Sequence, residues 1–309
     1  MKNLRGRHLL WLHDWSKEDI ETVVETAWNM KSNFYAGVRP TPLAGKTLAM
    51  IFSKPSTRTR VSFEVAMTQL GGHALYLGAN DLQLGRGETI SDTAQVISRY
   101  CDGIMIRTFS HKDVEDLAKY SRVPVINGLT DLTHPVQILA DLLTIKEKFG
   151  CLKGLKLAFV GDGNNVAHSL MFGGAKMGME VRVVCAPGYE PDKEITRLAT
   201  EDAASHGGKI VVTNDVDSGL KDIDIVYTDV WTSMGQEKER EIRLAKLAPY
   251  QVNDAMMQKT GKDTVFMHCL PAHRGEEVTA DVADSPRSVI FDEAENRLHA
   301  QKALLALVM

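Results

Sequence analysis

The stretch Phe52-Ser-Lys-Pro-Ser-Thr-Arg-Thr-Arg60 decides how the start of this chain folds. An apolar run from Thr47 precedes it and apolar residues at helical spacing follow from Val61, so it predicts a turn between a strand and a helix. The first N–H groups of such a helix lack partners and the helix dipole is positive there, which favours an anion. Hydroxyls and the planar cations Arg58 and Arg60 could hold phosphate oxygens. A plain helix cap beside solvated arginines is the alternative interpretation.

Strand and helix signals alternate along the rest of the chain, which predicts an α/β protein with parallel sheets covered on both faces. An opening helix is expected at 16–35, with Ser16 and Asp19 in a capping box. Strands are expected at 47–52, 73–77, 103–109, 123–127, 156–160, 180–185, 209–213, 223–228, 264–268 and 288–291, and a last helix from about 294. The pattern restarts near residue 150, so we expect two doubly wound domains, 1–149 and 150–292, followed by the C-terminal helix 293–309.

Composition narrows the class of protein. The 309 residues carry a net charge of −4, which implies no basic face for nucleic acid. Four cysteines lie without C-x-x-C spacing, which favours reduced thiols in a cytoplasmic protein over disulfides or a zinc site. No segment reaches the length of a membrane span, and the apolar run Leu9 to Leu12 is too short for a signal-peptide core.

Polar clusters follow six of the expected strands. Parallel sheets bind ligands at the carboxyl ends of their strands, so these clusters predict one site in the cleft between the two domains. They are the Ser-Thr-Arg-Thr turn, Arg107, the run from Asp131 to Gln137, the turn Gly161 to Asn165, the run Asp229 to Gly235, and His268 to Pro271.

The glycine turn at Gly161 and Gly163 matches only part of a dinucleotide-binding fingerprint. Val166 stands where the third glycine would be, and no acidic residue follows the next strand at Val184 and Cys185. The pattern therefore argues against a nicotinamide cofactor.

Taken together, the motifs resemble those of the aspartate/ornithine carbamoyltransferase family. They are Ser56-Thr57-Arg58-Thr59, Arg107, His134-Pro135-Val136-Gln137, Asp229 with Ser233-Met234-Gly235, and His268-Cys269-Leu270-Pro271. The last two sets resemble the ornithine-using members rather than the aspartate-using ones. The resemblance runs from the first helix to Met309, and Val136 is the one departure, at a position where many members carry another small side chain.

The resemblance implies a role for each matching residue. The residues expected to bind carbamoyl phosphate are Ser56, Thr57, Arg58, Thr59, Gln83, Arg107, His134, Pro135, Val136, Gln137, Cys269, Leu270 and Arg297. Those expected around the amino-acid end of ornithine are Asn165, Asp229, Ser233 and Met234, and those expected to be catalytic are Arg107, His134, Asp229 and Cys269. Gln83 would act across a subunit boundary, which implies a homotrimer or a multiple of one, and the C-terminal helix would pack on the first domain.

The chemistry implied is carbamoyl transfer from carbamoyl phosphate to L-ornithine, without metal or organic cofactor. An alkylamine titrates near pH ~10.4, so the site must favour the neutral δ-amine before it attacks. Cys269 would lie near that amine, linked to Asp229, and the alternative for it is a structural buried thiol. Three other functions stay open: transfer to putrescine or another amine, a non-catalytic member of the fold, and a phosphate-sensing or nucleotide-binding module.

Overall fold

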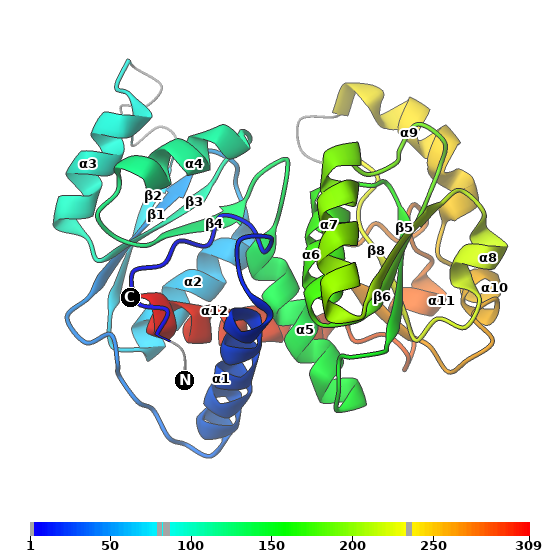
Figure 1. Cartoon of the computed structure of the whole chain (residues 1–309), viewed down its shortest axis with the longest axis horizontal. Coiled ribbons are helices and arrows are strands. Elements are labelled where there is room, and N and C mark those ends of the chain that lie inside the picture. Colours follow the sequence, from blue (N-terminus) through cyan, green and yellow to red (C-terminus); the bar gives the residue numbers. More distant parts are fainter. Residues whose placement is uncertain (1–2, 79–81, 83–86, 233–236) are drawn as a thin grey trace. The chain divides into compact units, whose positions relative to one another are not determined.

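The computed structural model describes residues 3–78, 82, 87–232 and 237–309, and it divides into two compact units (Figure 1). Unit 1 comprises residues 1–143 and 295–309, and unit 2 comprises residues 144–294. The divisions fall inside helix α5 (Pro135–Phe149) and helix α12 (Ile290–Val308), so both borders lie within helices and not in loops.

Unit 1 is built on a four-stranded parallel sheet in the order β2-β1-β3-β4. Its strands are β1 (Thr47–Phe52), β2 (His73–Gly78), β3 (Gly103–Arg107) and β4 (Val125–Leu129). Its helices are α1 (Lys17–Tyr35), α2 (Thr57–Gln69), α3 (Ile90–Tyr100), α4 (His111–Tyr120), most of α5 and the end of α12. Strands β3 and β4 are buried along their whole length, as expected for strands covered by helices on both faces. Ser16 and Asp19 form the expected capping box of α1.

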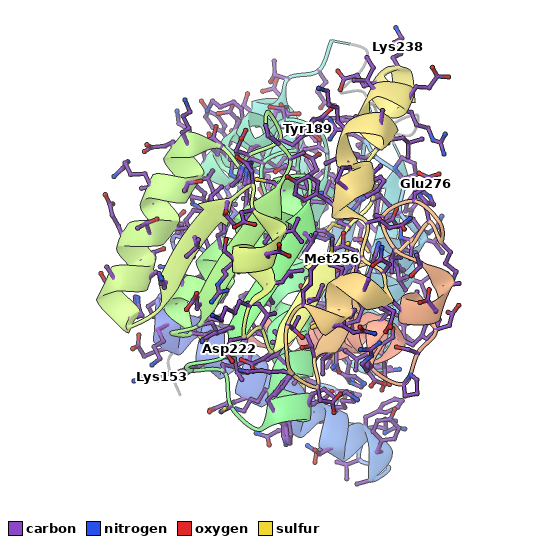
Figure 2. The ribbon with its side chains drawn as sticks, turned by 90° about the vertical axis from the view of Figure 1, so that its right-hand side faces the viewer. Lys153, Tyr189, Asp222, Lys238, Met256 and Glu276 are labelled. Carbon is purple, nitrogen blue, oxygen red and sulfur yellow. The ribbon has the colours of Figure 1, made fainter. Side chains whose placement is uncertain are left out.

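Unit 2 is built on a five-stranded parallel sheet in the order β7-β6-β5-β8-β9. Its strands are β5 (Lys156–Gly161), β6 (Glu180–Cys185), β7 (Lys209–Thr213), β8 (Ile225–Thr228) and β9 (Val265–His268). Its helices are α6 (Asn165–Lys176), α7 (Lys193–His206), α8 (Val216–Leu220), α9 (Arg240–Leu247), α10 (Asp254–Gln258) and α11 (Ala280–Ala283). Figure 2 shows the direction of the strands: Lys153 and Asp222, which precede β5 and β8, lie at the opposite end from Tyr189, which follows β6.

The predicted strand at 288–291 is wrong. Ser288 forms only an isolated bridge to Phe266, and α12 already begins at Ile290. A short apolar run such as Val289 to Phe291 does not distinguish a strand from a buried helix segment, whereas Asp292 and Glu293 suit the first turn of a helix.

The predicted fold class is confirmed, with two parallel α/β domains and a C-terminal helix that belongs to unit 1 from Glu295 onward. Each of the six polar clusters follows the carboxyl end of a parallel strand or begins at its last residue. Among the described residues, none of the helices has both the length and the apolar content needed to cross a membrane.

Candidate active site

Hydrogen bonds fix the turn that joins β1 to the start of α2. Ser56 caps the helix, because its Oγ accepts a hydrogen bond from the Thr59 N–H at 3.3 Å. The backbone N–H groups of Ser53 and Lys54 both donate to the carbonyl of Arg107, at 2.9 and 3.4 Å, which ties the turn to the end of β3. The helix N-terminus and the Arg107 backbone are therefore fixed together, as an anion site requires.

Lys54 is a cation of this turn that the motif reasoning did not assign. Its side chain is only 5% exposed, and its Nζ lies 3.1 Å from the Asp131 carboxylate and 4.8 Å from the centre of the Phe109 ring. Lys54 lies within the stretch from Phe52 to Arg60, and this position is the sequence signal that could have identified it. A buried ammonium with one exposed carboxylate partner adds positive charge to the turn.

Arg60 has a different environment. Its Nε donates to Glu64 at 3.0 Å, and its guanidinium lies 3.8 Å from the centre of the Tyr76 ring. Arg60 is therefore engaged on the outer surface of α2, whereas Arg58 is one of the cations whose charge acts on His134.

His134 is the centre of the positive group in unit 1. It is 5% exposed, and its pKa lies well below the usual value, first because burial disfavours the charged ring and then because Arg297, Arg107, Arg58 and Lys54 repel a further positive charge. The imidazole is therefore neutral at working pH. A neutral imidazole still carries one N–H group, which can donate a hydrogen bond to a carbonyl oxygen as that oxygen gains negative charge.

A chain of hydrogen bonds orients Gln137, which lies in the first turn of α5 after Pro135 and the buried Val136. Its Oε1 accepts from Arg297 at 2.6 Å and its Nε2 donates to Asp141 at 2.8 Å. Arg297 also donates to Thr59 Oγ1 at 3.2 Å, so α12 and α2 share one buried arginine. Asp141, fully buried one turn further along α5, is a second residue that the motifs did not point to.

In unit 2, Asp229 lies at the carboxyl end of β8 and is held from three sides. Its Oδ1 accepts from the Val230 N–H at 2.8 Å and lies 3.1 Å from Cys269 Sγ, and its Oδ2 accepts from Asn164 at 2.8 Å. Asn164 also caps α6, accepting from the N–H groups of the second and third helical residues. Asn165, which is expected at the amino-acid end of ornithine, is the partly exposed first residue of the helix, and the sequence motifs did not point to its neighbour Asn164.

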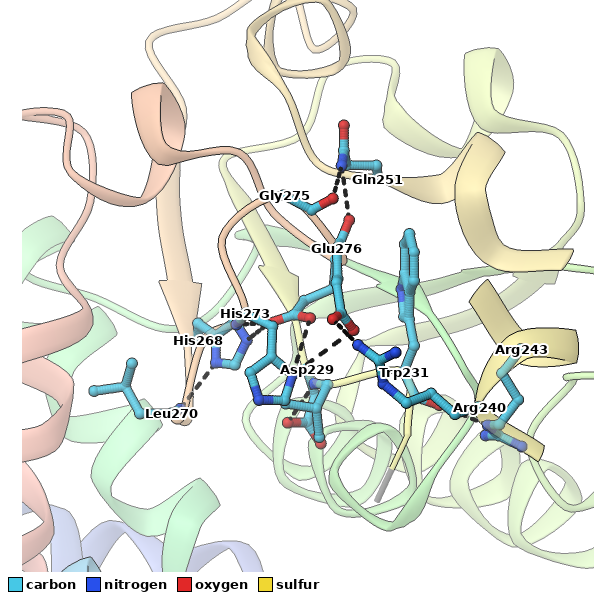
Figure 3. Close-up of polar contacts among 12 residues, drawn as sticks. Asp229, Trp231, Arg240, Arg243, Gln251, His268, Leu270, His273, Gly275 and Glu276 are labelled. Carbon is cyan, nitrogen blue, oxygen red and sulfur yellow. Dashed lines mark hydrogen bonds and ion pairs between the residues drawn. The ribbon is translucent and has the colours of Figure 1, made fainter. Parts of the chain in front are cut away.

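The turn after β9 presents Cys269 and Leu270. Leu270 has a φ of +59°, a left-handed conformation that branched side chains rarely adopt, and a cis bond to Pro271 follows it. His268 Nδ1 accepts the Leu270 N–H at 2.8 Å, so its proton lies on Nε2, which donates to the buried Glu277 at 3.1 Å. Figure 3 shows this arrangement, with His268 between Leu270 and the loop that carries Glu276.

Two groups among the described residues have donor atoms close enough for a metal ion: Asp229 with His268 and Cys269, and His273 with Glu276 and Glu277. In the first, Asp229 already binds the thiol and Asn164. In the second, Glu276 pairs with Arg240 and Glu277 accepts from two N–H groups. These partners would have to be displaced before a metal could bind.

Three residues expected in the site, Gln83, Ser233 and Met234, lie outside the described residues. Arg107 at the end of β3 and Arg297 on α12 belong to unit 1 with the turn after β1, whereas Asp229, Cys269 and Leu270 belong to unit 2.

The fold and these two clusters define a two-domain parallel α/β protein, with a group of buried cations in one domain and a carboxylate–thiol pair in the other. The family models identify the class further. Residues 7–147 match the carbamoyl-phosphate-binding domain of aspartate/ornithine carbamoyltransferases, and residues 153–308 match their Asp/Orn-binding domain. The chain belongs to the aspartate/ornithine carbamoyltransferase family.

Individual relatives cover the chain from end to end. It is 60% identical to the anabolic ornithine carbamoyltransferase of Pyrococcus furiosus over 99% of this chain and 98% of that protein. It is 58% identical to the ornithine carbamoyltransferase of Symbiobacterium thermophilum over all of both chains. The solved structure of the ornithine carbamoyltransferase from Pyrococcus furiosus superposes with a TM-score of 0.97 and 60% identity, covering 100% of this chain and 99% of the other.

Proposed function

We propose that this chain transfers the carbamoyl group of carbamoyl phosphate to the δ-amine of L-ornithine, giving L-citrulline and phosphate by direct attack through a tetrahedral intermediate. The close relatives named ornithine carbamoyltransferase support this reaction. The observation that carries it is the neutral, buried His134 surrounded by Arg58, Arg107, Arg297 and Lys54 beside a capped helix N-terminus.

That arrangement suits carbamoyl phosphate because the molecule has two acceptor ends. The α2 N-terminus, with Ser56, Thr57, Arg58 and Thr59, would hold the phosphate. Arg107, His134 and Arg297 would donate to the carbonyl oxygen as it becomes an oxyanion. All three are buried and Arg297 is held by Gln137 and Thr59, which reduces the reorganisation needed. Gln137 and the Leu270 carbonyl would hold the carbamoyl nitrogen. No step in this scheme requires a metal or organic cofactor.

Unit 2 would bind the amino acid. The Asp229 carboxylate suits the α-ammonium group of ornithine, and Asn165, Ser233 and Met234 complete the proposed amino-acid site. Cys269 would lie beside the δ-amine, with its thiol held by Asp229, and would help to keep that amine neutral while the leaving phosphate accepts a proton. A ligand without an α-amino acid end, such as putrescine, would leave these polar groups unmatched.

We further assign carbamoyl phosphate to residues 1–149 with helix 293–309, and ornithine to residues 150–292. The proposed assembly is a homotrimer or a multiple of trimers in the cytoplasm, with Gln83 acting across the subunit boundary. Light scattering on the purified chain tests the assembly, and a monomer that retains full activity would contradict the shared site. The anabolic relative favours citrulline synthesis as the direction of the reaction.

The test of the reaction is citrulline or carbamoyl-amine formation with L-ornithine, putrescine, L-aspartate and N-acetyl-L-ornithine as acceptors. Turnover with ornithine alone is expected, and Arg58→Ala should abolish it. Arg60→Ala is the matched control, because Arg60 lies in the same helical turn but pairs with Glu64 and Tyr76. Turnover with another acceptor would overturn the assignment of unit 2, and equal losses in both variants would overturn the phosphate assignment.

A further inference from the structure

Arg243 of α9 is buried and joins three segments of unit 2. Its Nε donates to the carbonyl of Trp231 at 2.6 Å, its Nη2 binds the Asp162 carboxylate, and its guanidinium carbon lies 5.0 Å from the centre of the Tyr189 ring. Only 6% of the residue is exposed. We call the set Asp162, Trp231 and Arg243 the Arg243 clasp, and Figure 3 shows its Trp231 and Arg243 members.

We propose that the Arg243 clasp is a positioning device for the amino-acid substrate: it holds the turn after β5 and the segment after β8 in the geometry that binds the α-amino acid end of ornithine. The inference rests on the proposed function and adds residues to it, since neither Asp162 nor Arg243 is among the residues proposed to bind either substrate. Arg243 acts through other residues and does not itself touch substrate.

The first connection runs through the turn after β5. Asp162 is two residues from Asn164, and the Asn164 N–H donates to the Asp162 carbonyl at 2.7 Å. Asn164 in turn holds Asp229 Oδ2, and Asp229 holds the Cys269 thiol. A shift of Asp162 would therefore move the carboxylate proposed to bind the substrate ammonium.

The turn after β5 is also held by the segment from Tyr189 to Pro191, which packs against Gly163. The Gly163 N–H donates to the Tyr189 carbonyl at 2.8 Å, and a Cβ on Gly163 would lie 2.3 Å from the Pro191 nitrogen. Tyr189 supplies both the carbonyl that holds Gly163 and the ring beside Arg243. The backbone of Glu190 and Pro191 lies against Gly163, so the turn has little room to move. We therefore expect a displacement of Arg243 or Tyr189 to be passed on to the turn.

The second connection runs along the chain from β8. Trp231 is two residues after Asp229 in the sequence. Arg243 holds the Trp231 carbonyl, and so fixes the chain close to the carboxylate proposed to bind the substrate ammonium. Among the described residues, the buried Trp231 Nε1 has no hydrogen-bond partner. The indole ring is therefore not held in place by a hydrogen bond of its own.

Burial of the Asp162–Arg243 pair supports a functional role. Burial raises the pKa of the Asp162 carboxyl to about 6, although Arg243 lowers it, and Asp229 and Glu239 raise it further. The attraction of Arg243 therefore does not repay the desolvation of the carboxylate. A buried ion pair that costs stability is weak evidence of a structural role and a reason to look for a functional one.

The experiment compares steady-state kinetics of the full-length chain with Arg243→Gln, Arg243→Lys and Asp162→Asn. We expect Arg243→Gln to raise the KM for ornithine about tenfold or more, because glutamine lacks the charge and the forked donors that hold the Asp162 carboxylate and the Trp231 carbonyl together. The KM for carbamoyl phosphate should stay within about twofold, since its proposed ligands are mostly in unit 1. Arg243→Lys keeps the charge but not the forked donors, so its KM for ornithine should fall between those of the wild-type and Gln variants.

Arg240→Gln is the matched control. Arg240 begins the same helix and pairs with a carboxylate, Glu276, but it is exposed and is no part of the clasp (Figure 3). Its KM for ornithine should equal that of the wild-type chain. A pH series adds a readout that a purely structural role would not move: the wild-type KM for ornithine should rise below pH about 6, and Asp162→Asn should remove that rise.

Each result decides the proposal. An unchanged KM for ornithine in folded Arg243→Gln, or an equal rise in the KM values for both substrates, would overturn it. If Arg243→Gln does not fold, Asp162→Asn decides, because its amide can still accept from Arg243 while the titration is lost. Failure of the proposed function itself would show differently, since the wild-type chain would then turn over no ornithine at all.

Discussion

Asp162→Asn offers a test of the clasp in a quantity separate from catalysis, the pH dependence of folding stability. The folded-state pKa of Asp162 is about 6, against a reference value of 3.8. Because the folded pKa is raised, the contribution of this group to stability is fully present below pH 3.8 and is lost as the pH rises through 6. A difference of about two units corresponds to about 3 kcal/mol.

Asparagine does not titrate, so the Asp162→Asn variant lacks this loss. The Tm of the variant should therefore rise relative to that of the wild type as the pH rises from 4 to 7. The expected change is roughly 6 °C for a compact unit of the size of unit 2. Other carboxyl groups titrate in both proteins and cancel in the difference. Differential scanning fluorimetry at five or six pH values measures it.

Asp222→Asn is the control for this series. Asp222 is exposed beside Lys156 and Lys262, which lower the pKa of its carboxyl to about 2. That contribution is lost only as the pH falls through 2, so the Asp222 variant should differ from wild type by a constant amount between pH 5 and pH 7. A Tm difference for Asp162→Asn that is flat, or that moves in favour of wild type, would show that the Arg243 attraction outweighs burial and would refute the reasoning.

Three further outcomes are expected. His134→Ala removes one N–H donor to the developing oxyanion and should lower kcat about 10²–10³-fold. Because the pKa of His134 is lowered, the wild-type kcat/KM for carbamoyl phosphate should show no inflection near pH 6.5 from this histidine. Cys269→Ala removes the thiol that binds Asp229, so its KM for ornithine should rise while thermal stabilisation by carbamoyl phosphate alone persists; loss of that stabilisation would contradict the assignment. Gly163→Ala should lower the stability of unit 2 by about 1–3 kcal/mol, because its Cβ would lie 2.3 Å from the Pro191 nitrogen; an unchanged Tm would contradict the tight packing of this turn.

Much of the fold could be predicted from the sequence because its signals are local. Apolar runs alternating with helical spacing predict parallel strands and covering helices, and the last residue of each strand then marks the binding edge. The capping box of α1 and the cap at Ser56 depend on residues within one helical turn, and both occur where expected. The error at 288–291 arose where a short apolar run suits either type of element.

The sequence by itself determined the two-domain α/β class, the six polar clusters at the strand ends and the turn that begins at Phe52. Only the tertiary structure decided which side chains in and around those clusters are joined. It pairs Asn164 with Asp229, buries Lys54 near His134, and brings Arg243 to Asp162 across eighty-one positions of sequence. Burial and charge depend on what folding brings close in space, so no local pattern reports them.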